Sequence, residues 1–262
     1  MNMKKKWLCL LSALLIVFSL AACGSDSSET SDKGKSDFES FMAVQKNMEN
    51  IKDMEFKMSM DAEVPSDQGD YNMKMSGTGK EIKKSNTDIQ MEMDYKMNAA
   101  GTDMSGTMYM KDQALYMEFM GQKVKMDTSN EMNSLMNVDT EDIFAITKDM
   151  VSDLKVSEDG GDTVYKFTLD PSKALDYVSK NVAGAKGISE AQKNTTFDKM
   201  NVTVLADKNN MAKKVDMDFS MTTKANDETI TMNYKMTMEY LSINTDLKID
   251  FPDFKDYQEM TV

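Results

Sequence analysis

Cys23 is the residue whose setting most clearly points to covalent chemistry. It directly follows the small-residue stretch Leu20-Ala21-Ala22, which ends an apolar run that begins at Trp7 behind a head of three lysines. That order is typical of a secretory signal, in which small residues precede the cut. The apolar run holds about 14 residues, fewer than the roughly 20 that span a bilayer, which disfavours an uncleaved membrane anchor. We therefore predict a signal peptide at residues 1–22.

A cysteine in this place resembles the lipobox of bacterial lipoproteins. The resemblance implies that Cys23 becomes the first residue, is acylated, and holds the protein at the extracytoplasmic face of the cell membrane. Two or three acyl chains suffice for stable attachment, whereas one binds only marginally. Residues 24–36 contain no apolar side chain. We therefore expect residues 23–36 to form a lipidated, flexible tether.

The side chains that most often carry out catalysis are scarce. The chain has no His, which removes the commonest general base and the commonest metal ligand. Cys9 leaves with the signal and Cys23 is expected to be acylated, so the folded part keeps no thiol. The sequence contains neither a G-x-S-x-G motif nor a glycine-rich phosphate loop. We predict no catalytic residue, no metal site and no cofactor, and a protein that is not an enzyme.

The charge of the chain limits the classes of partner that it can bind. The formal net charge is −13, and every basic residue is Lys. An acidic chain without Arg is a poor binder of nucleic acid, whose affinity comes largely from phosphate contacts. An anionic lipid surface would repel it as well, so membrane attachment must depend on the acyl groups of Cys23.

A change of hydrophobic period along the chain separates helices from strands. Ser36 and Glu39 have the spacing of a capping box, and an apolar stripe follows, which predicts a helix at residues 37–52. Strict alternation of apolar and polar residues then predicts a meander of about six antiparallel strands, the clearest at residues 54–64 and 89–97.

The period becomes helical again near residues 139–154, where Asp139 or Thr140 is a plausible N-cap. A strand is predicted at residues 164–169, and Asp170-Pro171 has the form of a helix start. A polar loop should occupy residues 183–196. A second block of strands then extends to Phe251, where Pro252 should end the last strand.

The 29 methionines suggest what the sheet is for. Most of them fall on one face of the predicted strands, with polar residues on the other. A sheet of about ten strands has a face several times larger than three short helices can cover. It must curl on itself, bind something apolar, or both. Met side chains suit irregular apolar ligands because they are unbranched and polarizable.

Two other interpretations stay open at this stage. In the first, Met replaces Leu or Val in an ordinary closed core, and the protein is a structural or interaction module of the cell envelope. In the second, Met-x-Met pairs such as Met58/Met60 and Met236/Met238 bind Cu(I), which thioethers select. Such sites usually include His or Cys, which makes this third hypothesis the weakest.

The order of elements resembles the lipoprotein-carrier superfamily, which includes LolA and LolB and the lipid-transfer lipoproteins LppX and LprG. It is more similar to uncharacterised lipoproteins of Gram-positive bacteria, on the alternating pattern of residues 91–97, the Leu115-Tyr116-Met117 hairpin and the ending at residues 248–252. The resemblance covers residues 38–257. One departure is that LolA holds its lid with an arginine, and this chain has none, so LolA's release mechanism does not carry over.

This resemblance implies an α+β fold that is mostly antiparallel β. We expect one domain at residues 37–262, a curved half-barrel sheet of about 10–11 strands, and about three helices that close a concave, lipid-binding face. The implied lid residues are Phe144, Ile146 and Met150. The implied cavity residues are inward-facing side chains of the strands: Met58, Met60, Met73, Met91, Met93, Tyr95, Met217, Phe219, Met232, Tyr234 and Met236.

Overall fold

The structure is a computed structural model of the chain, and it describes the greater part of residues 36–259. The described ranges are 36–64, 71–85, 88–99, 101–112, 114–127, 146–170, 172–173, 195–197, 200–225 and 228–259. The predicted signal peptide and Cys23 lie outside them, as does all of the predicted tether except Ser36. Those predictions therefore stay predictions.

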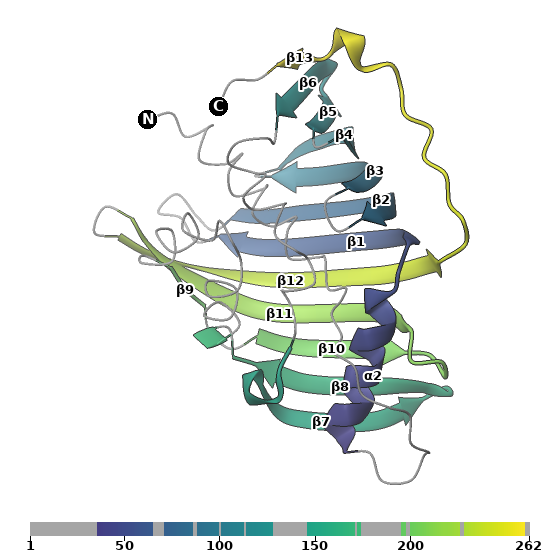
Figure 1. Cartoon of the computed structure of the whole chain (residues 1–262). Coiled ribbons are helices and arrows are strands. Elements are labelled where there is room, and N and C mark those ends of the chain that lie inside the picture. Colours follow the sequence, from purple (N-terminus) through teal and green to yellow (C-terminus); the bar gives the residue numbers. More distant parts are fainter. Residues whose placement is uncertain are drawn as a thin grey trace.

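One large sheet organises the described residues (Figure 1). It contains 13 strands, in the order β13-β6-β5-β4-β3-β2-β1-β12-β11-β10-β8-β7, and β9 pairs with β11. All pairs are antiparallel except β13 with β6. The strand bounds are β1 (Asp53–Val64), β2 (Tyr71–Ser85), β3 (Asp88–Ala99), β4 (Thr102–Lys111), β5 (Ala114–Phe119), β6 (Gln122–Asp127), β7 (Val151–Asp159), β8 (Asp162–Leu169), β9 (Thr195–Phe197), β10 (Met200–Ala206), β11 (Ala212–Ala225), β12 (Glu228–Ile243) and β13 (Gln258–Glu259).

The predicted mostly antiparallel sheet is confirmed, and its register explains the two-residue period of the sequence. One row that crosses six strands consists entirely of methionines: Met217, Met236, Met60, Met75, Met97 and Met104. The next row along the strands is polar, because side chains alternate between the two faces. It runs through Thr237, Ser59, Ser76, Lys96 and Ser105. We call the side of the sheet that carries the Met row the Met face, and the side that carries the polar row the polar face.

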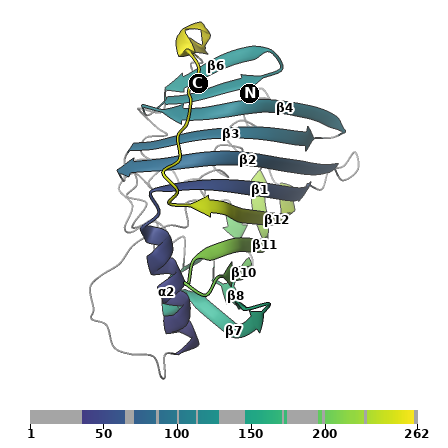
Figure 2. The same cartoon turned by 90° about the vertical axis from the view of Figure 1, so that its right-hand side faces the viewer.

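Helix α2 (Asp37–Glu49) covers the Met face at one end of the sheet (Figures 1 and 2). Its buried side chains include Phe41, whose ring centroid lies 5.6 Å from that of Tyr165 and 4.9 Å from that of Phe167. The hydroxyls of Ser40 and Tyr165 are 2.7 Å apart. These contacts fix the amphipathic stripe of α2 against β8.

The predicted capping box at the start of α2 is confirmed. The backbone N–H of Glu39 donates to Ser36 Oγ at 3.3 Å, and the backbone N–H of Ser36 donates to the Glu39 carboxylate at 2.7 Å. The predicted end at residue 52 is three residues too late, because Asn50 is the C-cap.

Removing this cap gives a first prediction. Ser36→Ala is expected to destabilise the protein by about 1 kcal/mol, because the Glu39 N–H loses its acceptor. Urea denaturation followed by far-ultraviolet circular dichroism measures the change. Ser59→Ala, on the exposed polar face, is the matched control and should stay within about 0.5 kcal/mol of the parent. Equal stability of the two variants would contradict the capping argument.

The prediction of a helix that runs to residue 154 is wrong. Residues Lys148–Met150 form a single 3-10 turn, η2, and strand β7 begins at Val151. The register of β7 against β8 shifts between Ser152 and Lys155, and Asp153 has a positive φ of 56°. This irregularity places Val151 and Leu154 at a spacing of three, which imitates the period of a helix.

The prediction of three helices is likewise not met, since α2 is the one α-helix longer than a turn within the described ranges. The helix start at Asp170 is supported locally, because its carboxylate accepts from the backbone N–H groups of Ser172 and Lys173. The rest of that segment and Phe144 lie outside the described residues. The predicted loop at residues 183–196 overlaps strand β9, which begins at Thr195.

The end of the chain also differs from its predicted strand. Strand β12 stops at Ile243, and residues 244–257 run past the ends of β1–β4 to reach β6 (Figure 2). The Asp53 carboxylate fixes the exit by accepting from the N–H groups of Thr245 and Asp246. The alternation of Leu247, Ile249 and Phe251 therefore belongs to an extended strap outside the sheet.

Aromatic rings hold this strap to the polar face. Phe254, in the 3-10 turn η3 (Phe254–Asp256), stacks on Tyr116 with centroids 3.8 Å apart. Its ring also lies edge-on to Tyr109 and Tyr257. Tyr109 and Tyr116 pair with each other across β4 and β5. The strap thus covers apolar surface at outward positions of β4 and β5.

Candidate functional site

All eleven side chains predicted to line a cavity lie on the Met face. Their strands are β1, β2, β3, β11 and β12, which are neighbours in the sheet. Eight of them are buried, and Met93 is only 1% exposed. The three others are partly buried and pack against the same core: Met73, Met91 and Tyr95. The parity of the sequence therefore places these residues together, whereas a bound ligand stays a prediction.

The Met face is irregular because glycines interrupt its rows. Gly77 and Gly79 of β2 lie at inward positions, opposite Met58 and Phe56 of β1. A Cβ on Gly77 would lie 3.2 Å from the sulfur of Met93, and one on Gly79 would lie 2.6 Å from the Phe56 ring. Neighbouring side chains thus lean into the space that each glycine leaves. An apolar face of this kind adapts to its surroundings through the flexibility of Met.

Aromatic residues mark the β11–β12 part of the face. Phe219 and Tyr234 stack with centroids 5.0 Å apart and an angle of 15° between their planes. The hydroxyl of Tyr234 donates to the sulfur of Met232 at 3.3 Å. This contact gives a buried phenol a thioether acceptor.

Two of the three predicted lid residues are described, and both belong to the core. Ile146 and Met150 are 8% and 6% exposed, directly before β7. The backbone N–H of Asp170 donates to the carbonyl of Met150 at 2.8 Å, which joins this segment to the end of β8. Both residues belong to the core cluster, and their role as a lid stays a prediction.

Sequence analysis missed two charged residues on the Met face, Glu81 and Lys83. The alternation recognised in the sequence stops at Ser76, whereas β2 continues to Ser85 and keeps the inward parity of Met73 and Met75. Glu81 therefore lies opposite Met54 of β1 and Met91 of β3. Extending the parity across the two glycines would have found both residues.

Burial raises the pKa of the Glu81 carboxyl to about 7, against a smaller opposing effect of the Lys83 charge. Burial also raises the pKa of Tyr240, and the negative charge of Glu81 adds to that increase. The side chains are thus close enough to interact electrostatically. They form a polar corner in an otherwise apolar face.

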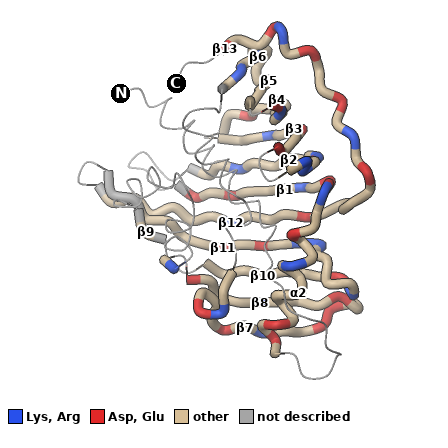
Figure 3. Tube along the Cα trace, in the orientation of Figure 1, with Lys and Arg blue, Asp and Glu red and all other residues tan. Residues whose placement is uncertain are grey.

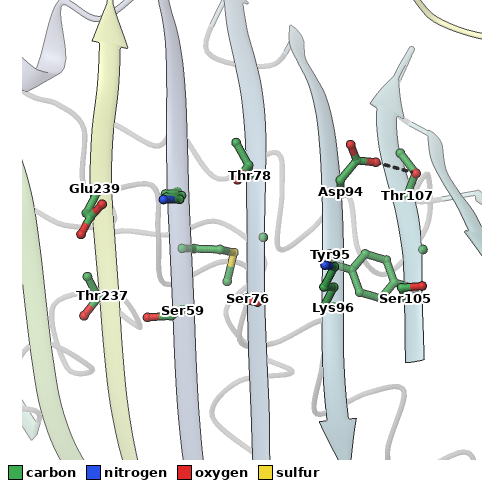
Figure 4. Close-up of a pocket in the computed structure, with 14 residues that line it drawn as sticks. Ser59, Ser76, Thr78, Asp94, Tyr95, Lys96, Ser105, Thr107, Thr237 and Glu239 are labelled. Atoms are coloured by element: carbon green, nitrogen blue, oxygen red, sulfur yellow. Dashed lines mark hydrogen bonds between the residues drawn. The ribbon is translucent and has the colours of Figure 1, made fainter. Parts of the chain in front are cut away.

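The opposite, polar face has a groove of about 710 Å³ across β12, β1, β2, β3 and β4 (Figure 4). Asp94 accepts from the Thr107 hydroxyl at 2.7 Å within it. Outward side chains form most of the lining, and their charges have both signs, as along the other strands (Figure 3). The lining residues are Lys57, Met58, Ser59, Ser76, Gly77, Thr78, Asp94, Tyr95, Lys96, Ser105, Gly106, Thr107, Thr237 and Glu239.

Two further kinds of feature are absent from the described residues. They contain no cluster of three or more His, Cys, Asp or Glu side chains arranged to hold a metal ion. None of the helices in those ranges has both the length and the apolar character that crossing a membrane requires. Neither finding concerns thioether sulfurs, so Cu(I) binding by Met-x-Met pairs stays a prediction. The side chains of one such pair, Met58 and Met60, are 6% and 2% exposed.

Comparison with known proteins gives a family and several solved structures. The model of a family of unknown function, DUF6612, matches residues 39–254. No curated protein matches the chain significantly. LprF from Mycobacterium bovis is 9% identical with a TM-score of 0.46, covering 82% of this chain and 97% of that one.

Two other solved structures are similar over comparable lengths. A putative outer membrane lipoprotein-sorting protein domain from Vibrio parahaemolyticus is 12% identical with a TM-score of 0.29, covering 81% of this chain and 95% of that one. A DUF1329 family protein from Desulfovibrio piger is 10% identical with a TM-score of 0.31, covering 80% and 94%. At these TM-scores the likeness carries no argument about ligand or partner.

Proposed function

The chain belongs to the DUF6612 family, and we propose that this member binds a lipid or another apolar ligand against its Met face, as a carrier or a sensor. The observation that carries the proposal is the size and composition of that face. One continuous row of Met side chains crosses β11, β12, β1, β2 and β3. Those five strands span about 19 Å across the sheet, a length suited to an extended acyl chain.

Coverage of the face supports the same proposal. Helix α2 packs over β8, at the far end of the sheet from β3. No other helix longer than a turn covers the Met rows within the described ranges. An apolar ligand that lies along the rows would gain about 25 cal/mol for each Å² of its own apolar surface removed from water. The unbranched Met side chains would adjust to its shape.

The proposed location follows from the N-terminal sequence. Acylation of Cys23 would hold the domain at the outer surface of the cell membrane, as in Gram-positive lipoproteins. A tether of about 13 residues has a mean reach of roughly 20 Å, so the Met face would stay close to the lipid surface. A ligand could then pass between membrane and protein over a short distance.

Binding is tested on the mature chain carrying Cys23→Ser, which stays soluble without acyl groups. The expected results are lipids in organic extracts of the purified protein and an increase in the fluorescence of added N-phenyl-1-naphthylamine. Met73→Lys, on the Met face, is expected to weaken binding of this probe at least about tenfold, because binding would bury a charge. Ser76→Lys, on the polar face, is the matched control and should bind as the parent does.

A closed core gives a different outcome in the same experiment. Neither an extracted lipid nor a fluorescence change would be found, and Met73→Lys and Ser76→Lys would then be alike in binding. That result would overturn the proposed function and favour a structural or interaction module of the envelope.

The anchor is tested separately in cells. Cys23→Ser is expected to move the protein from the membrane fraction to the medium or the soluble envelope fraction, because the acyl acceptor is gone. Labelling with an alkyne fatty acid measures acylation directly. Membrane association that persists in Cys23→Ser without label would contradict the anchoring proposal.

A further inference from the structure

We propose that Glu81 and Tyr240 bind the polar head of the ligand, and that this head carries a positive charge. The proposal rests on the function proposed above and names the ligand class: an amphiphile with an ammonium head and an apolar tail. The tail would lie along the Met rows, and the head would lie at the corner formed by the ends of β1, β2 and β12 (Figure 1).

The register places the two residues in this corner. Glu81 lies opposite Met54 on β1, and Tyr240 lies opposite Phe56, two residues further along β1. Both therefore occupy inward positions in neighbouring rows. At the inward positions described on β1, β2 and β3, Glu81 is the one acidic residue. A carboxyl at a single point of an apolar face gives an amphiphile one defined orientation.

No hydrogen bond or ion pair within the described residues explains the position of the carboxyl, although the Lys83 charge, two residues along β2, attracts it at longer range. In the part of the chain that the structure describes, Glu81 makes no side-chain hydrogen bond and no ion pair. Its neighbours on β1 and β3, Met54 and Met91, are uncharged. The remaining titratable groups that face it are Lys83 of its own strand and Tyr240 of β12. The Glu81 side chain is only partly buried, so a ligand head can reach it, and a ligand cation would supply the ion-pair partner that this carboxyl lacks.

The charge of the head follows from these side chains. A carboxylate attracts an ammonium group and repels a phosphate, sulfate or carboxylate head. The ring of Tyr240 adds a cation–π surface for the same group. The chain also has no Arg, the residue that best recognises phosphate and carboxylate heads.

Three probes with the same tail and different heads test the inference: decyltrimethylammonium, decanesulfonate and decanol. Each is titrated against the mature Cys23→Ser chain, with displacement of N-phenyl-1-naphthylamine as the signal. The cation is expected to bind at least tenfold more tightly than the anion. Its affinity should increase several-fold between about pH 6 and about pH 8 as the carboxyl ionises, whereas decanol affinity should stay constant.

Two variants assign the effect to this corner. Glu81→Gln is expected to lose the tenfold preference and its pH dependence while keeping decanol affinity. Tyr240→Phe retains the ring and should keep most of the preference. Glu92→Gln, an acid on the outward side of neighbouring β3, is the matched control and should behave as the parent does.

Failure of this inference can be distinguished from failure of the proposed function. If decanol binds but the cation is not preferred, or if Glu81→Gln retains the preference, the headgroup assignment is overturned and apolar binding stands. If none of the three probes displaces the fluorophore and the fluorophore itself does not bind, the proposed function is overturned.

Discussion

Raising the pH from about 5 to about 8 is expected to destabilise the protein by roughly 2 kcal/mol more than it destabilises the Glu81→Gln variant. The expectation comes from the Glu81 carboxyl, whose pKa is raised from its ordinary value of 4.5 to about 7 by burial. The comparison with the variant isolates Glu81 from the general repulsion among the other acids. Urea unfolding at several pH values measures the two free energies.

The direction follows from proton binding in the two states. Between about pH 4.5 and about pH 7 the folded protein keeps a proton on Glu81 that the unfolded chain has released. Stability therefore falls as pH rises, because the folded state binds more protons. The contribution of the protonated carboxyl is fully present below about pH 4.5 and is lost as the pH rises through about 7. Gln mimics the neutral carboxyl, so its stability should not change in this way.

Glu92→Gln is the control for this experiment, since Glu92 lies at an outward position of β3, where it pairs with Lys80 of β2 and Tyr109 of β4. Its stability profile is expected to run parallel to that of the parent. Parallel profiles for the parent and Glu81→Gln would contradict the inward, desolvated position of the carboxyl.

The alternating segments were predictable because one local rule determined them. Residues 54–64 and 89–97 lie within β1 and β3, with errors of one or two residues at their ends. Each strand has one solvated face, so every second residue must be apolar whatever its partner strand is. The capping box was predictable for the same reason, since Ser36 and Glu39 satisfy each other's backbone within a single turn.

Contacts between distant segments decided the features that the sequence did not reveal. The pairing of β1 with β12 joins residues almost 200 positions apart, and no local pattern specifies that partner. The strap at residues 244–257 alternates like a strand, but Asp53 turns the chain away from the ladder at Thr245 and Asp246. A backbone that leaves a sheet through such a side-chain contact cannot be distinguished from a strand by its period alone.

In the candidate site, too, local patterns predicted some residues and contacts between distant segments decided others. Strand parity was enough to place Met58, Met93 and Met236 on one face. The parity of β2 continues through Gly77 and Gly79, but glycines in a strand also signal turns, so the sequence allows either reading there. Glu81 was missed for that reason. Its raised pKa depends on burial by other strands, which no sequence pattern measures.

Gly106→Ala is expected to destabilise the protein by about 3 kcal/mol, the upper end of the usual cost of overpacking. Gly106 lies on β4, between Tyr95 of β3 and Phe119 of β5. A Cβ there would overlap the carbonyl oxygen of Glu118 and would lie 2.8 Å from the Tyr95 hydroxyl. The tyrosine could move, but the carbonyl belongs to the backbone of β5, so the strand itself would have to shift.

Two comparison variants make this a test of the close approach. Gly77→Ala should cost less, because one of its two closest contacts is the flexible side chain of Met93, 3.2 Å from the new Cβ. Ser105→Ala, one residue away on the polar face, should stay within about 0.5 kcal/mol of the parent. Urea denaturation measures the free energy of unfolding of Gly106→Ala, Gly77→Ala and Ser105→Ala and so ranks the three variants. If Gly106→Ala were as stable as Ser105→Ala, the β4–β5 approach would be looser than described.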